Sequence, residues 1–106
     1  MSTFRLPQGQ RFALETGAES IEAEIMAEKG AALGRAGHRV EVTLAALKAF
    51  DAGEAVGVER SSLVKDAATA VWYYFIQREA CGIRDQKPAI AHYAIPREVL
   101  MRLGAR

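Results

Sequence analysis

The sequence predicts an all-α fold, a compact bundle of three main helices and a short C-terminal helix, preceded by an extended N-terminal arm. Apolar residues recur at steps of three and four through most of the 106 residues, and no pair of segments alternates as paired strands do. Four consecutive aromatic residues, 72–75, also lie inside a segment with helical periodicity. A chain of this length is the size of one domain, so we expect residues 1–106 to form a single helical domain.

Residues 1–16 are predicted to form the arm. They show no clear period and contain the turn formers Pro7 and Gly9. The two phenylalanines of this segment, Phe4 and Phe12, need an apolar surface to pack on. We therefore expect them to contact the rest of the domain or a second chain.

The first helix is predicted over residues 17–36. Thr16 and Glu19 have the spacing of a capping box at its start. Small residues share one face of this helix, namely Ala23, Ala27, Gly30, Gly34 and Gly37. An interior glycine costs about 1 kcal/mol relative to alanine. Gly30 and Gly34 therefore indicate either close approach of another helix, in our interpretation an interface, or a break in the helix near Gly30.

Three more helices follow. Gly37 and His38 resemble a tight turn into a second helix over residues 39–52, and a glycine-containing loop separates it from a third over residues 61–80. The pattern is then lost in a long connection, and Pro96 opens a short fourth helix over residues 96–103.

Trp72, Tyr73, Tyr74 and Phe75 lie near the middle of the predicted third helix. Four consecutive helical positions point in most directions, so this helix must be covered on more than one side. On a helical projection Tyr73 faces the polar side, where solvent or a second chain would meet it, and the other three aromatic residues face the core.

Charged residues follow the aromatic run, and a buried charge needs a partner. Arg78 paired with Asp85, and Glu79 paired with Arg84, would form a charged knot that holds the following loop. The alternative is that the helix leaves the core by residue 77 and that these side chains are solvated.

An alternative interpretation of the same region is a ligand-binding site. The guanidinium groups of Arg78 and Arg84 have the geometry to bind a carboxylate or phosphate, with His92 and Tyr93 nearby in the sequence. No second signal supports it.

The sequence argues against an enzyme, a metal site and a cofactor. Cys81 is expected at the C-terminal end of a helix, where the helix dipole disfavours a thiolate, and its spacing from His38 and His92 matches no usual zinc motif. No Walker loop, Rossmann glycine pattern or nucleophile elbow is present.

Net charge is +1, which argues against nucleic-acid binding, and no apolar stretch is long enough to cross a membrane. Ionisable residues are all acidic over residues 15–28, whereas bases outnumber acids over residues 78–106. This asymmetry either steers two chains together or marks two solvated faces. A lone cysteine and no signal-peptide pattern predict a cytoplasmic location.

Three segments of the last third carry a resemblance: residues 77–85 (QREACGIRD), 93–99 (YAIPREV) and 102–104 (RLG). With these segments the chain resembles a small family of uncharacterised bacterial proteins of about this length. The resemblance implies a bacterial cytoplasmic protein with a helical fold. No activity is attached to the family, so the resemblance identifies no site residues.

We therefore expect a small cytoplasmic, self-associating helical protein with an interaction or structural role, and a homodimer as its favoured state. The faces to be covered are more than four helices supply within one chain. The alternatives are a module that binds an anionic small molecule through residues 78–93, and a nucleic-acid-associated regulator.

Overall fold

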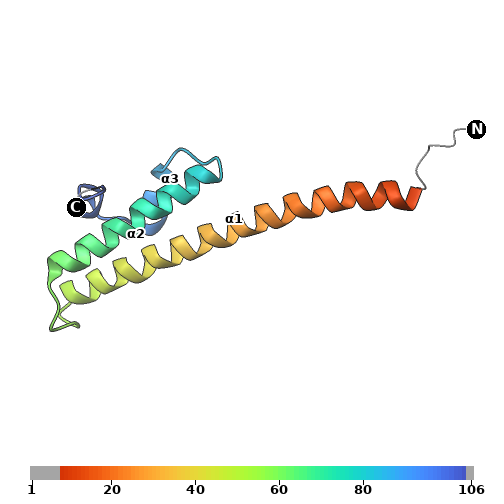
Figure 1. Cartoon of the computed structure of the whole chain (residues 1–106). Helices are drawn as coiled ribbons and strands as arrows, with labels where there is room; N and C mark the ends of the chain where they lie inside the picture. The colour runs from red at the N-terminus through yellow and green to blue at the C-terminus, as the bar shows by residue number, and fades with distance from the viewer. Residues whose placement is uncertain (1–7, 105–106) are drawn as a thin grey trace, which may run out of the picture.

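The computed structural model describes the backbone of residues 8–104 and the side chains of residues 17–104. Within this part of the chain there are four α-helices and no strand, which confirms the all-α class. The helices are α1 (Gln8–Asp51), α2 (Arg60–Ala80), α3 (Lys87–Tyr93) and α4 (Arg97–Leu100). Figure 1 shows α1 and α2 as an antiparallel hairpin, with α3 and the C-terminal segment packed around α2.

Helix α1 is one continuous helix of 44 residues, so the prediction of separate helices at 17–36 and 39–52 is wrong. The helix neither turns at Gly37 and His38 nor breaks at Gly30. Glycine costs about 1 kcal/mol in a helix interior. That cost is smaller than the gain from burying Ala36 and the residues that follow it on one continuous face.

The predicted N-terminal arm also differs, because the backbone of residues 8–16 already belongs to α1. Phe12 therefore lies in a helix, although its side chain is outside those described. Phe4 lies outside the described residues.

The hydrophobic core lies between the C-terminal half of α1 and α2, and α3 and α4 close it. Its side chains are mostly small, and Val40, Val71 and Val99 are fully buried. Small side chains allow the two long helices to approach closely over several turns. Among residues 17–104, the buried apolar residues are Ala36, Val40, Leu47, Val64, Ala67, Ala68, Ala70, Val71, Tyr74, Ala89, Ile95 and Val99.

Helix α2 begins one residue before the predicted helix 61–80 and ends with it. The connection that follows contains α3, which the sequence analysis did not predict. Pro88 occupies the first turn of α3, where a missing N–H costs nothing. Helix α4 is shorter than the predicted 96–103 and continues as turns to residue 104.

The molecule is elongated, with extents of 79 × 25 × 24 Å, and is not the compact bundle of three main helices that we expected. Two long helices form its body, and the N-terminal half of α1 extends far beyond the end of α2 (Figure 1). We call residues 17–31 of α1 the projecting segment. Every side chain in it is exposed, including Ile21 (60% exposed), Ile25 (51%) and Met26 (66%).

The aromatic run of α2 is half buried. Tyr74 is buried and Phe75 is half-buried, but Trp72 and Tyr73 are both 47% exposed. The exposure of Tyr73 was predicted. The core position predicted for Trp72 is wrong, because α1 covers α2 on one side and no further long helix among the described residues covers the other.

Candidate functional site

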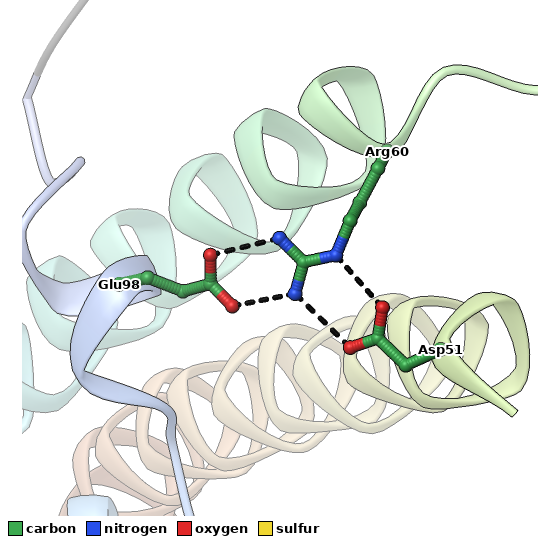
Figure 2. Close-up of polar contacts among 3 residues, drawn as sticks. All are labelled: Asp51, Arg60 and Glu98. Carbon is green, nitrogen blue, oxygen red and sulfur yellow. Dashed lines mark hydrogen bonds and ion pairs between the residues drawn. The ribbon is translucent and has the colours of Figure 1, made fainter.

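Three elements meet at the guanidinium group of Arg60, the first residue of α2. On one side it donates two hydrogen bonds to Asp51 at the end of α1, from Nε to Oδ1 (2.7 Å) and from Nη2 to Oδ2 (3.0 Å). On the other side it donates two to Glu98 in α4, from Nη1 to Oε2 (2.9 Å) and from Nη2 to Oε1 (2.6 Å). Figure 2 shows the guanidinium between the two carboxylates, an arrangement that we call the Arg60 clamp.

The electrostatics of the Arg60 clamp favour its fully ionised form. Hydrogen bonds from Arg60 lower the pKa of Asp51 and of Glu98 below their ordinary values of 3.8 and 4.5. The same bonds, that to Glu98 first, raise the pKa of Arg60. The four bonds occupy four of the five N–H groups that a guanidinium carries. The clamp therefore joins α1, α2 and α4 and has little donor capacity left for an anionic ligand.

Sequence reasoning missed the Arg60 clamp because its carboxylates lie 9 and 38 residues from Arg60. One half of it had a signal. Asp51 ends one helix and Arg60 begins the next, so the loop between them brings the two ends together. The pairing with Glu98 depends on where α4 packs, and the sequence holds no local sign of that.

A second cluster forms where Tyr93, at the end of α3, meets both long helices. Its ring packs edge-on against Tyr74 with centroids 5.4 Å apart. Its hydroxyl lies so close to Gly37 that a Cβ atom there would be 2.6 Å from the oxygen. The missing side chain of Gly37 therefore leaves space for Tyr93 inside a continuous helix, whereas the sequence analysis assigned Gly37 to a turn.

Burial raises the pKa of Tyr93 to about 12, and the neighbouring Tyr74 hydroxyl adds to the effect. Glu41 on α1 raises it further, whereas Arg78 lowers it. The phenol stays protonated at neutral pH, so this group does not act there as a base. Tyr93 belongs to α3 and lies against both α1 and α2, which indicates a packing role.

Arg78 holds the loop that follows α2. It donates from Nε to Oε1 of Gln86 (2.8 Å) and from Nη2 to the backbone oxygen of Asp85 (2.9 Å). Its guanidinium carbon lies 5.7 Å from the centre of the Tyr74 ring. The predicted charged knot thus has Arg78 and Asp85 in contact, but through a main-chain oxygen instead of the carboxylate. Glu79 is exposed and forms no ion pair with Arg84 within the described residues.

The residues predicted to bind an anionic ligand do not converge on one cavity. Arg78 is occupied by the loop, Arg84 is exposed, and His92 packs edge-on against Tyr93 at 4.7 Å between ring centroids. A shallow groove of about 500 Å³ does include Tyr93. Its other walls come from α1, from the segment before α4 and from α4 itself: Leu44, Ala45, Leu47, Lys48, Asp51, Ala94, Pro96 and Glu98.

The cysteine and histidines of the sequence analysis are far from forming one site. Cys81 is half-buried at the C-terminal end of α2, with Sγ 4.0 Å from the backbone oxygen of Lys29. His38 is exposed on α1 beside Glu41, and its Nδ1 lies 3.8 Å from that carboxylate. Among the described side chains, no three His, Cys, Asp or Glu residues are grouped as metal ligands would be.

Two residues of the predicted interface lie in the part of α1 whose side chains are described. Gly30 and Gly34 are exposed, and no atom lies within 4 Å of a Cβ built at either position. Tyr73 is exposed on the opposite long helix. The side chain of Phe12 and the whole of Phe4 lie outside the described part of the chain.

Comparison with known families identifies the chain. The model of a family of unknown function, DUF6665, matches residues 9–106. The chain belongs to the DUF6665 family. The match confirms the predicted membership of a family without an assigned activity. Comparison of this DUF6665 protein with curated proteins and with solved structures found no significant match. None of its described helices is long and apolar enough to span a membrane.

Proposed function

We propose that this DUF6665 protein is a small self-associating helical protein with an interaction or structural role, and that it works as a homodimer. The observation that carries the proposal is the projecting segment. Over residues 17–31 no side chain is covered, although Ile21, Ile25 and Met26 are among them. An apolar helix face of this kind marks an interaction surface.

Helix energetics support the proposal. Isolated helices are marginal in water, and most helical stability in proteins comes from packing of an apolar face. Gly17 and Gly30 each cost the projecting segment about 1 kcal/mol relative to alanine. A second chain that covers the apolar face would offset this cost and keep the segment helical.

The rest of the molecule is suited to present this segment. The Arg60 clamp ties the hairpin end of α1 to α2 and α4, and Tyr93 packs against both long helices. The half of α1 next to the projecting segment is therefore held firmly. The free thiol of Cys81 is consistent with a reducing compartment, and we place the protein in the cytoplasm of a bacterium.

The absolute molar mass in solution tests the proposal. Light scattering coupled to size exclusion, run from low to high micromolar concentration, should give twice the chain mass of 11.5 kDa at the upper end. A monomer mass at every concentration would refute it.

The two alternatives predict other signals. An anionic ligand bound near Arg84 would raise the thermal stability in a screen of phosphates and carboxylates. A nucleic-acid complex would weaken steeply as salt is added. No contact among the described residues favours either alternative.

A further inference from the structure

We infer that the projecting segment of each chain docks on the outer face of α2 of a second copy, so that the two chains lie side by side in a reciprocal dimer. The outer face of α2 is the exposed side that carries Thr69, Trp72 and Ile76. This inference rests on the proposed self-association and names the surface that receives the projecting segment.

The outer face of α2 is apolar and points away from α1. Trp72 is 47% exposed and Ile76 is 37% exposed, and they are neighbours on one face because four residues separate them. Cys81 lies nine residues, or about two and a half turns, after Trp72 and therefore points in the opposite direction. Its Sγ is 4.0 Å from the backbone oxygen of Lys29 in α1, so Trp72 faces away from α1. The described part of one chain thus has two uncovered apolar helix faces, this one and that of the projecting segment.

The uncovered part of α1 is as long as α2. Because Cys81, directly after the end of α2, lies beside Lys29, α2 covers α1 only from there onward. Residues 8–28 extend beyond it and number 21, and α2 is also a helix of 21 residues. Each spans about 32 Å, so each uncovered part of α1 matches the whole α2 helix of the other copy. With the starts of the two helices aligned, Ile21 falls within about one turn of Ile76 of the other copy.

The antiparallel hairpin sets the direction of docking. When the α1 helices of two copies lie antiparallel, the projecting segment of one copy runs parallel to α2 of the other (Figure 1). The two α2 helices then point toward each other, and they meet end to end without overlapping because residues 8–28 are as long as α2. The chain turns back at this point, since the backbone N–H of Ile83 donates to the oxygen of Arg78 (2.9 Å). Helix α2 therefore ends bluntly at Cys81 and leaves room for the second α2 helix.

The apolar face of the projecting segment points toward this site. Ile25 lies eleven residues, or about three turns, before Ala36, so the two side chains lie on nearly the same side of α1. Ala36 is 2% exposed because α2 covers it, whereas Ile25 is 51% exposed. In the reciprocal dimer, α2 of the second copy covers Ile25 as α2 of the same chain covers Ala36. Each α2 helix then has an α1 helix on both sides.

Charge and area both favour this pairing. The projecting segment carries four acids and one base, whereas residues 60–104, which form α2 and the elements packed around it, carry seven bases and four acids. These opposite net charges attract, so added salt should weaken the dimer. The twofold axis provides two equal contacts, each about 32 Å long and about 10 Å wide. Counted on both surfaces they bury about 1,300 Å², within the range of specific interfaces.

The test places one charge on each of the two surfaces in the full-length chain. We expect Ile21→Glu and Ile76→Lys each to raise the dimer Kd at least about tenfold, because each change enters both contacts. An equimolar mixture of the two variants should associate at least about tenfold more tightly than either variant alone. One contact of the mixed dimer is wild type, and the other pairs opposite charges.

Two control variants place the same charges elsewhere on α1. Ala27 lies nine residues, or about two and a half turns, before the buried Ala36 and therefore faces the opposite side. Val42 is 52% exposed on the half of α1 that the same chain's α2 covers. We expect Ala27→Glu and Val42→Lys each to change Kd by less than about threefold. Circular dichroism at high concentration shows whether each variant keeps its helix content.

Two measurements on the wild type are independent of these variants. Trp72 is the only tryptophan of the chain, so its emission should move to shorter wavelength as the concentration rises and the dimer covers it. Small-angle scattering should give a dimer close to 79 Å long, the length of one chain. A dimer held only by overlapping ends would be about 120 Å long.

Four results would overturn the inference while leaving self-association intact. They are a dimer about 120 Å long, a dimer that tightens with salt, tryptophan emission that does not change while the molar mass doubles, and an Ile76→Lys variant with the wild-type Kd. A strictly monomeric wild type would refute the proposed function as well.

Discussion

Replacing Gly37 with alanine adds one methyl group at a crowded point of α1. In an open helix the change stabilises the folded protein by about 1 kcal/mol. Here the new Cβ would lie 2.6 Å from the Tyr93 hydroxyl oxygen and 3.4 Å from a ring carbon of Tyr74. Tyr93 is packed edge-on against Tyr74, so its ring has little freedom to move away. Overpacking of this kind costs about 1 to 3 kcal/mol. We expect Gly37→Ala to be neutral or to lower the free energy of unfolding by up to about 2 kcal/mol.

The chain supplies a matched control. Gly34→Ala makes the same change one turn earlier, with no atom within 4 Å of the new Cβ, and should stabilise by about 1 kcal/mol. Tyr93→Phe removes the crowded oxygen, and the next ring atom lies at 3.7 Å, an ordinary contact. Gly37→Ala should therefore become stabilising in the Tyr93→Phe background. Urea unfolding followed by circular dichroism, at one fixed protein concentration, measures all four variants. If Gly37→Ala stabilises the wild type as much as Gly34→Ala does, the clearance role of Gly37 is refuted.

Three other predictions follow from the core and the charged residues. Val71→Ala removes two carbons at a fully buried position and should cost about 2 kcal/mol in urea unfolding; a cost below about 0.5 kcal/mol would contradict the packing described for α2. In the folded protein the pKa values of Asp51 and Glu98 lie below their ordinary values of 3.8 and 4.5. The contribution of these two carboxylates to the free energy of unfolding is therefore complete above the ordinary pKa values, and it is lost as the pH falls through the lowered, folded-state values. Unfolding curves from about pH 7 to about pH 2 should show that Arg60→Gln loses less stability on acidification than the wild type does. Equal losses in the two proteins would argue against the clamp. The pKa of Tyr93 is raised from 10.0 to about 12. The contribution of its protonated phenol to the free energy of unfolding is therefore complete below about pH 10 and is lost as the pH rises toward about 12. Tyrosinate absorbance should show a late step that Tyr93→Phe lacks, and a late step that persists in this variant would refute the assignment.

Sequence reasoning succeeded where the signal is local. The limits of α2 follow from its apolar periodicity and its position between two glycine-containing segments. The exposure of Tyr73 follows from its place on the helical projection. In each case residues a few positions apart decide the outcome.

Sequence reasoning failed where a contact between residues far apart in the chain decides the structure. A glycine at position 37 looks the same in the sequence whether it forms a turn or leaves space inside a helix for another side chain. Here that side chain is Tyr93, 56 positions away in the chain, whose hydroxyl lies against Gly37. Trp72 looked buried because its helix is apolar around most of its circumference, but its exposure depends on which neighbours exist. Glu98 became a partner of Arg60 because α4 packs beside the start of α2.

The sequence by itself determined that this chain is helical, that its helices carry broad apolar faces, and that it shows no catalytic motif. Those properties follow from spacing and composition. Only the tertiary structure decided that α1 runs unbroken from Gln8 to Asp51 and outruns α2. The reason is physical: a helix of 44 residues facing one of 21 leaves part of its apolar face without a partner, and no local pattern records the length of a neighbour.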